Sequence, residues 1–281
     1  MIKSVLTFLV VVCSIAAPVS SHAGGNIVRM SDGQTVSFPQ TMADVQSSDV
    51  TLIGETHDNT KHHGLQLDVI RSFREKKVPL AIGVEMFQAD YQKQLDDWTE
   101  GSISEQNFKE IYARNWSYDW SLYREIFLFA RDNRIPMVAL NVPKEIVFKV
   151  ARKGFDSLTP EERKNLPGGI TCDINKPQTE FLKRTFQNVF GHDASGKVFT
   201  SFCEAQAVRN NGMAILITDY LKRNPGRKLV VLAGTWHAVK HGIPDRLRES
   251  NSVSFKVLQP EINELGTRNA TLAITDYLIE R

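Results

Sequence analysis

Short apolar runs alternate with stretches of helical periodicity along most of the chain. Between Thr60 and Lys77, for example, apolar residues recur every three to four positions, as on one face of a helix. Strands separated by helical segments are typical of βαβ units, so the sequence predicts an α/β fold with a mainly parallel sheet flanked by helices. The predicted strands are Val50–Gly54, Leu80–Met86, Met137–Leu140 and Leu229–Ala233, with weaker candidates at Val253–Leu258 and Leu272–Ile279.

Three segments depart from this alternation. Residues 24–48 form a Gly- and Ser-rich leader with a short hairpin around residues 31–33. Residues 88–130 are helical, with a loop at 114–119, and residues 143–223 contain no convincing strand. In the last segment, Thr159-Pro160-Glu161-Glu162 is typical of a helix start, with proline at the first position and acids in the first turn. We therefore expect the segments 88–130 and 143–223 to form a helical subdomain, inserted into the α/β layer or packed over it.

The first 23 residues have the pattern of a secretory signal peptide. Lys3 precedes an apolar stretch from Val5 to Ala17, and Ser21-His22-Ala23 has the small-x-small form that signal peptidase cleaves. The apolar stretch is short for a membrane-spanning helix. We expect residues 24–281 to be exported to a periplasm as one α/β domain. An outer-membrane lipoprotein modified at Cys13 is less favoured, because Val12 stands where a small residue is needed.

Two cysteines, Cys172 and Cys203, remain after the predicted cleavage. In an oxidising compartment such a pair can form a disulfide. The sequence contains no distance between them, so a disulfide and two buried thiols are equal alternatives at this point.

Charge and missing motifs exclude several classes of protein. The net formal charge is +2, and no basic run with interleaved aromatic residues occurs, which argues against nucleic acids and anionic membranes as partners. The chain also has no Gly-rich phosphate loop, no Gly-x-Ser-x-Gly motif and no CxxCH motif. Ordinary serine hydrolases and c-type cytochromes are thereby excluded.

One short motif occurs twice, far apart in the chain. Gly54-Glu55-Thr56-His57 closes one predicted strand, and Gly234-Thr235-Trp236-His237 closes another. Because the carboxyl ends of parallel strands meet at one edge of a sheet, where ligands usually bind, we predict that His57 and His237 share a site. An imidazole there can ligate a metal or haem iron, donate to a carboxylate, or act as a general base.

Two carboxylates are expected at the same edge. Glu55 belongs to the first motif, and Glu85 ends an apolar strand in Gly83-Val84-Glu85-Met86. Burial of an unpaired carboxylate is costly. Glu85 is therefore predicted to orient an imidazole, bind a metal or serve as a base, with a salt bridge to a nearby Arg or Lys as the alternative.

Three further histidines are weaker candidates. His62 and His63 are consecutive on a predicted helix, so at most one of them is expected to face the edge. His241 follows His237 by four residues, the spacing of zinc-binding helices. Ala238 stands where a zincin has its glutamate, which excludes that class.

Tyrosines matter if the ligand is haem, because a phenolate suits ferric iron. Tyr118 lies in the aromatic loop 116–120, which is a suitable wall for a flat macrocycle or, alternatively, an aromatic helix start packed on the core. The other tyrosines are Tyr91, Tyr112, Tyr123, Tyr220 and Tyr277.

The sequence resembles the ChaN-like haem-binding lipoproteins, in the right order and over nearly the whole of residues 24–281. The residues that carry the resemblance are Gly54-Glu55-Thr56-His57-Asp58-Asn59, Lys61-His62-His63, Gln66, Val84-Glu85-Met86-Phe87-Gln88, Leu140-Asn141-Val142-Pro143, Asn211-Gly212-Met213-Ala214, Ala233-Gly234-Thr235-Trp236-His237 and Gly242-Ile243-Pro244.

That resemblance implies a haem-uptake protein with a parallel α/β core and a helical subdomain. Such proteins pair two haems face to face between two subunits, with a tyrosine on each iron and a histidine and a lysine of the partner on the propionates. Haem, a homodimer and outer-membrane haem-uptake machinery are thus the implied cofactor and partners. The haem-binding residues expected here are His57, Glu85, Tyr118 and His237, with Tyr91 and Tyr220 as further candidates for the iron ligand.

The same motifs also resemble the wider Tiki, TraB and erythromycin esterase group. That likeness implies an alternative function, a peptidase or esterase, with or without a bound metal. In this alternative His57, Glu85 and His237 bind the metal or activate water.

Overall fold

The structure is a computed structural model that describes residues 25–164, 166, 172, 177–191, 196–249 and 253–280. The predicted signal peptide, with Cys13, lies outside the described residues. Within them, one eight-stranded sheet has the order β2-β1-β8-β7-β3-β6-β4-β5. None of the helices described is both long and apolar enough to span a bilayer.

The sheet is mainly parallel, as predicted. The pairs β8–β7, β7–β3, β3–β6, β6–β4 and β4–β5 are parallel, whereas β1 pairs antiparallel with both β2 and β8. The strands are β1 (Ile27–Arg29), β2 (Gln34–Val36), β3 (Val50–Glu55), β4 (Leu80–Gln88), β5 (Met137–Asn141), β6 (Lys228–Gly234), β7 (Phe255–Pro260) and β8 (Tyr277–Ile279).

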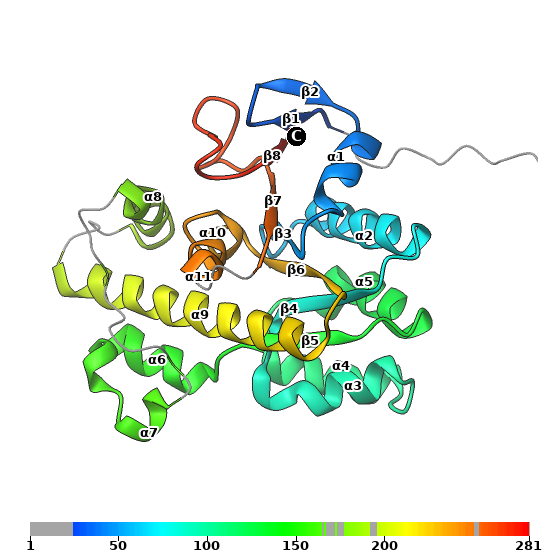
Figure 1. Ribbon diagram of the computed structural model, residues 1–281. Coiled ribbons are helices and arrows are strands. Elements are labelled where there is room, and N and C mark those ends of the chain that lie inside the picture. Colours follow the sequence, from blue (N-terminus) through cyan, green and yellow to red (C-terminus); the bar gives the residue numbers. More distant parts are fainter. Residues whose placement is uncertain are drawn as a thin grey trace, which may run out of the picture.

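Helices cover both faces of the sheet, and in Figure 1 α9 crosses it on the viewer's side. On the far side lie α1 (Phe38–Val45), α2 (Thr60–Glu75), α3 (Gln92–Thr99), α4 (Glu105–Asn115) and α5 (Trp120–Asp132), and the short turn η1 (Ala89–Tyr91) joins β4 to α3. On the viewer's side lie α9 (Gly196–Arg223) and, with it, α6 (Lys144–Lys153), α7 (Pro160–Arg163), α8 (Pro177–Phe190), α10 (Thr235–Ala238) and α11 (Ile243–Glu249). The short turn η2 (Phe155–Ser157) follows α6 and packs on it.

The central strands are apolar on both faces because both faces are covered. All six residues of β3 are buried, with Leu52 in the core on the α9 side and Ile53 in the core on the α2–α5 side. The stripe predicted on α2 is buried as well, including Val69 and Phe73. Asn59 caps this helix by accepting from the backbone N–H groups of Lys61 and His62.

Several element boundaries differ from the prediction. β4 continues to Gln88, where a helix was expected to begin, and η1 follows it directly. Of the weak candidate 272–279 only the last three residues form β8. The preceding residues turn instead, with the Ile274 N–H donating to the carbonyl of Thr271. The β1–β2 hairpin and the loop between α4 and α5 are where the sequence placed them.

Helix α1 was missed inside the predicted leader. Its signal is local, since Ser37 and Gln40 form a capping box and a proline occupies the first turn. The same device starts α7, where Thr159 accepts from the Glu162 N–H, as the sequence predicted.

The two helical segments occupy opposite sides of the sheet. The helices within 88–130 share one core with β4 and β6. In the other segment, α9 packs on β5 and α6 packs on α9. A disulfide joins Cys172 to Cys203 at a Cα–Cα separation of 5.5 Å, which settles the alternative left open by the sequence and ties the chain after α7 to α9.

Candidate functional site

His57, Glu85 and His237 come together at the carboxyl edge of the sheet. Glu55 pairs in register with Gly234, so the two Gly-x-x-His turns leave neighbouring strands side by side. The Gly234 N–H donates to Glu85 Oε2 at 2.7 Å. A Cβ built on Gly234 would lie 2.8 Å from His57 Cε1, so glycine is needed for this close approach. His237 Nε2 lies 3.7 Å from Glu85 Oε1.

The two carboxylates reach this edge from opposite faces of the sheet. Alternate residues of a strand point to opposite faces. Glu55 follows Ile53 on the side of α2 and α5, whereas Glu85 points to α9. The register of β4 shifts between Val84 and Gln88, and such irregularities re-aim side chains next to functional sites.

Glu55 is the centre of a buried hydrogen-bond network. Its carboxylate accepts from His57 Nδ1 at 2.7 Å, from Gln66 Nε2 at 2.7 Å and from the Tyr123 hydroxyl. His63 Nε2 lies 3.4 Å from Oε2 without hydrogen-bond geometry. Burial alone raises the pKa of Glu55, but the contacts to His57 and His63 outweigh it and hold this pKa below its usual range. Glu55 is therefore an ionised carboxylate that orients His57.

His57 is the exposed end of this network. Its Nδ1 is held by Glu55, its side chain is 24% exposed, and its Nε2 side faces Gly234 and Glu85. Burial lowers the pKa of His57, but the hydrogen bond to Glu55 and the charge of Glu85 raise it above its usual value. An imidazole oriented in this way can donate to an anion, accept a proton or bind a metal.

We expect His57 to titrate above its usual value of about 6.5. Since the native state then holds this proton more tightly than the unfolded chain, the stability gained is fully present below about pH 6.5 and is lost as the pH rises through the native pKa. NMR titration of the His57 ring measures the pKa, and Glu55→Gln should lower it. A wild-type ring that titrates below the usual value would contradict this network.

Glu85 is paired with Arg209 of α9, which is the salt bridge that the sequence left as the alternative, and it also lies beside His237 at the edge of the sheet. Arg209 binds Glu85 Oε1 and also donates from Nε to Asn141 Oδ1 at 3.3 Å. Burial raises the pKa of Glu85, but the charge of Arg209 and the N–H of Gly234 outweigh burial and hold this pKa below its usual range, so the group is ionised.

His237 is a neutral imidazole at physiological pH. Its side chain is 4% exposed, and its Nδ1 lies 2.6 Å from Asn210 Oδ1. Burial, together with the nearby positive charge of Arg209, lowers the pKa of His237 to about 3. The two histidines of the repeated motif therefore differ in chemistry, because His57 is partly exposed and favours protonation while His237 is buried and uncharged.

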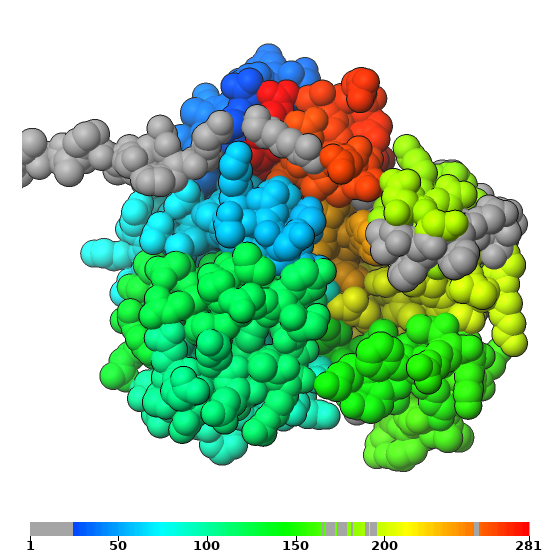
Figure 2. Space-filling view, turned by 180° about the vertical axis from the view of Figure 1, so that it is seen from behind, coloured from blue at the N-terminus to red at the C-terminus, as the bar shows by residue number. Residues whose placement is uncertain are grey.

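An aromatic wall stands beside His57. The ring of Trp116 lies 4.9 Å from the His57 ring, edge to face, and the ring of Tyr118 lies 5.1 Å from it. Tyr118 is 38% exposed, which is high for a tyrosine packed between two other rings. Seen from behind, in Figure 2, the surface is hollowed between the helices α3–α5 and the helices of the α9 side.

The remaining tyrosines differ in their access to this wall. Tyr112 and Tyr123 are buried behind Glu55, and the Tyr277 hydroxyl donates to Asp44 at 2.7 Å. The charge of Arg227 acts on the pKa of Tyr220, so Tyr220 lies near Arg227. Arg227 donates to the carbonyl of Leu80, which is at the other end of β4 from Glu85. Tyr91 follows β4 and packs half-buried on the core.

The other candidate histidines have partners of their own, and His62 and His63 are buried. His63 contacts Glu55 from below, and His62 Nδ1 accepts from the Thr56 N–H at 2.9 Å. Helix α10 ends at Ala238, so His241 shares no helical face with His237, and it lies 3.5 Å from Asp245 instead. Among the described residues, no three His, Cys, Asp or Glu side chains are arranged to hold a metal ion.

Comparisons with known proteins fit this geometry. A family model described as "Haem-binding uptake, Tiki superfamily, ChaN" matches residues 41–247. ChaN of Campylobacter jejuni, solved with cofacial haem, superimposes with a TM-score of 0.73 at 18% identity, over 91% of this chain and 96% of that one. At this identity the likeness shows a shared fold.

Two other similarities are more distant. A mutant of the erythromycin esterase EreC in its open conformation gives a TM-score of 0.49 at 11% identity, over 84% of this chain and 76% of that one. Protein RETICULATA-RELATED 5, chloroplastic, of Arabidopsis thaliana is 26% identical over 105 residues, which are 36% of this chain and 14% of that protein. The chain thus corresponds to a small part of that relative's length.

Proposed function

The chain belongs to the ChaN family of haem-binding uptake proteins in the Tiki superfamily, and from this premise we propose that it binds haem at the carboxyl edge of its sheet, in the bacterial cell envelope, for haem or iron uptake. In this proposal two copies enclose the haem at their interface. The observation that carries it is the aromatic wall of Trp116, Tyr118 and His57, in which Tyr118 is exposed, beside an ionised and buried polar network.

The residues at this wall fit haem. A flat macrocycle requires an exposed aromatic surface, a donor for ferric iron and cationic donors for its carboxylates. Tyr118 supplies the phenol of an exposed side chain, and His57 supplies an imidazole that favours protonation. Tyr118 would hold the iron through its phenolate oxygen, and bound haem would supply that ferric iron.

Export supports the same role. The segment before residue 24 is typical of a signal peptide, and a disulfide at Cys172 is typical of an oxidising compartment. We therefore place the protein in the periplasm, with the outer-membrane uptake machinery as the expected source of haem.

The test is a titration of the purified protein with hemin, followed by absorbance and by mass in solution. We expect a saturable Soret shift with one haem per chain, and a mass that doubles as the sites fill. A Soret spectrum that stays equal to free hemin would refute haem binding, and a loaded monomer would refute the cofacial dimer.

A metal-free hydrolase is the second candidate function. It is favoured by the Glu55–His57 pair, because a carboxylate that orients an imidazole is a common arrangement for a general base. The same preparation separates the two functions. Ester hydrolysis that is lost in His57→Gln, without a Soret shift in the wild type, would support the hydrolase in place of the haem protein.

A further inference from the structure

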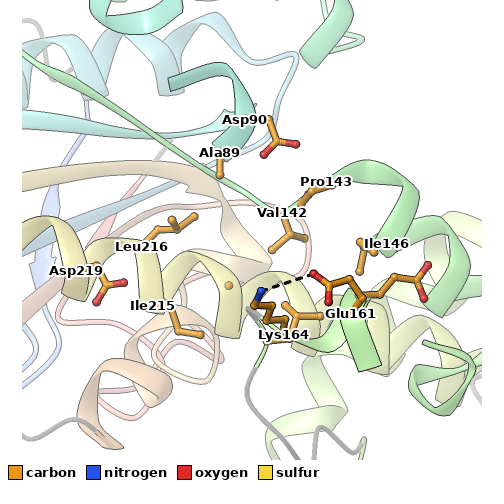
Figure 3. Close-up of a pocket in the computed structure, with 13 residues that line it drawn as sticks. Ala89, Asp90, Val142, Pro143, Ile146, Glu161, Lys164, Ile215, Leu216 and Asp219 are labelled. Atoms are coloured by element: carbon orange, nitrogen blue, oxygen red, sulfur yellow. Dashed lines mark ion pairs between the residues drawn. The ribbon is translucent and has the colours of Figure 1, made fainter. Parts of the chain in front are cut away.

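A cavity lies beside α9, and Figure 3 shows the residues that line it. Its volume is about 720 Å³, within the range of small-molecule sites. It is enclosed by α9, by η1, by the connection from β5 to α6, and by α7. None of the four residues proposed to bind haem lines it.

The floor of this cavity is aliphatic. The side chain of Val142 is buried against α9, since a Cβ built on Gly212 would lie 2.2 Å from Val142 Cγ1. Ile215 and Leu216 of α9 are half-buried and point toward the cavity in Figure 3. The apolar lining consists of Ala89, Val142, Pro143, Ile146, Leu166, Ile215 and Leu216, without an aromatic ring among the described residues.

The rim of the cavity is acidic. Four carboxylates and one ammonium line it, so its net formal charge is −3. Glu162 is already paired with Lys149 at 2.7 Å, and Glu161 lies 3.8 Å from Lys164. Asp90 of η1 and Asp219 of α9 have no side-chain hydrogen bond or ion pair within the part of the chain that the structure describes, and they stand at different sides of the opening in Figure 3.

We infer that this cavity binds an aliphatic organic cation, with its ammonium groups at Asp90 and Asp219 and its hydrocarbon body on Leu216 and Val142. An aliphatic floor favours a hydrocarbon chain, and unpaired carboxylates favour a cation that donates hydrogen bonds. Haem does not suit this cavity, because its propionates would meet carboxylates and the described lining offers no imidazole, phenol or thiol to iron. The site is thus independent of the proposed haem site.

The probe for this site is octamethylenediamine, measured by calorimetry on the full protein, with octamethylene glycol as the uncharged control. We expect saturable binding of the diamine that weakens at high salt, and no saturable binding of the glycol at the same concentrations. Equal binding of the two compounds would overturn the role of the carboxylates, and absence of diamine binding up to millimolar concentration would overturn the site.

Charge-removing variants locate the binding. Asp90→Asn and Asp219→Asn are each expected to weaken diamine binding about fivefold, the value of one modest ion pair. Glu145→Gln is the matched control, because Glu145 is an exposed acid of α6 that does not line the cavity. Unchanged diamine binding in both Asp variants, or equal weakening in the control, would overturn the inference. The Asp variants should give the same hemin titration as the wild type, whether or not the wild type binds haem, so that this test is separate from that of the proposed function.

Discussion

Replacing Arg209 with methionine is expected to lower the free energy of unfolding by about 3–5 kcal/mol, the largest effect of any single substitution proposed here. The variant leaves Glu85 ionised, 1% exposed and without its cation, and such a charge is far more costly than the pair itself is stabilising. Urea denaturation followed by circular dichroism measures the change.

Two further variants separate this electrostatic cause from lost packing. Adding Glu85→Gln to Arg209→Met should recover most of the stability, because replacing both members of a buried ion pair by uncharged residues often leaves the free energy of unfolding unchanged. Arg246→Met is the matched control, since Arg246 forms an exposed pair with Glu249, and it should change stability little. A double variant as unstable as Arg209→Met would show that the methionine fails for steric reasons.

In the hemin titration, Tyr118→Phe is expected to remove the phenolate-to-iron charge-transfer band and to weaken binding at least tenfold, while preserving the fold. Loss of the hydroxyl removes the iron ligand but keeps the ring against Trp116 and His57. Tyr91→Phe is the matched control and should keep the band. If Tyr91→Phe loses the band and Tyr118→Phe keeps it, the ligand has been assigned to the wrong tyrosine.

The pH dependence provides a second check on this ligand. Burial and the charge of Asp58 raise the pKa of Tyr118, so the free phenol carries its proton at neutral pH. Binding through the phenolate must release that proton, and haem affinity is expected to increase with pH in the wild type. The increase should be absent from Tyr118→Phe, as measured by titrations at several pH values.

The fold followed from features that sequence carries locally. Apolar runs such as Val50–Ile53 predict strands that are covered on both faces. The repeated motif predicts that His57 and His237 follow strands that end at the same edge of the sheet. The Gly- and Ser-rich composition of residues 24–48 predicts a leader without helix, whereas the capping box at Ser37 is a local signal for the start of α1. The short β8 depends on pairing with β1, a long-range contact that periodicity does not show.

The partners of the two carboxylates were harder to predict than the carboxylates themselves. Tyr123 and Arg209 reach Glu55 and Glu85 across 68 and 124 residues of sequence. Arg209 had one local signal, as a cation in a helix whose neighbours, such as Val208, are buried. Tyr123 had none, since an aromatic residue on an amphipathic helix is usually a core residue, and only its hydroxyl sets it apart.

The arrival of Glu55 and Glu85 from opposite faces of the sheet constrains any attempt to recombine this protein with a relative. A chimera that takes α2 and α5 from one parent and α9 from another must match a tyrosine, an arginine and two acids across the crossover. Exchange of a single layer would leave one acid without its donor. The two layers are therefore expected to be inherited and engineered as a unit, with productive crossovers confined to the β1–β2 hairpin and the outer helices.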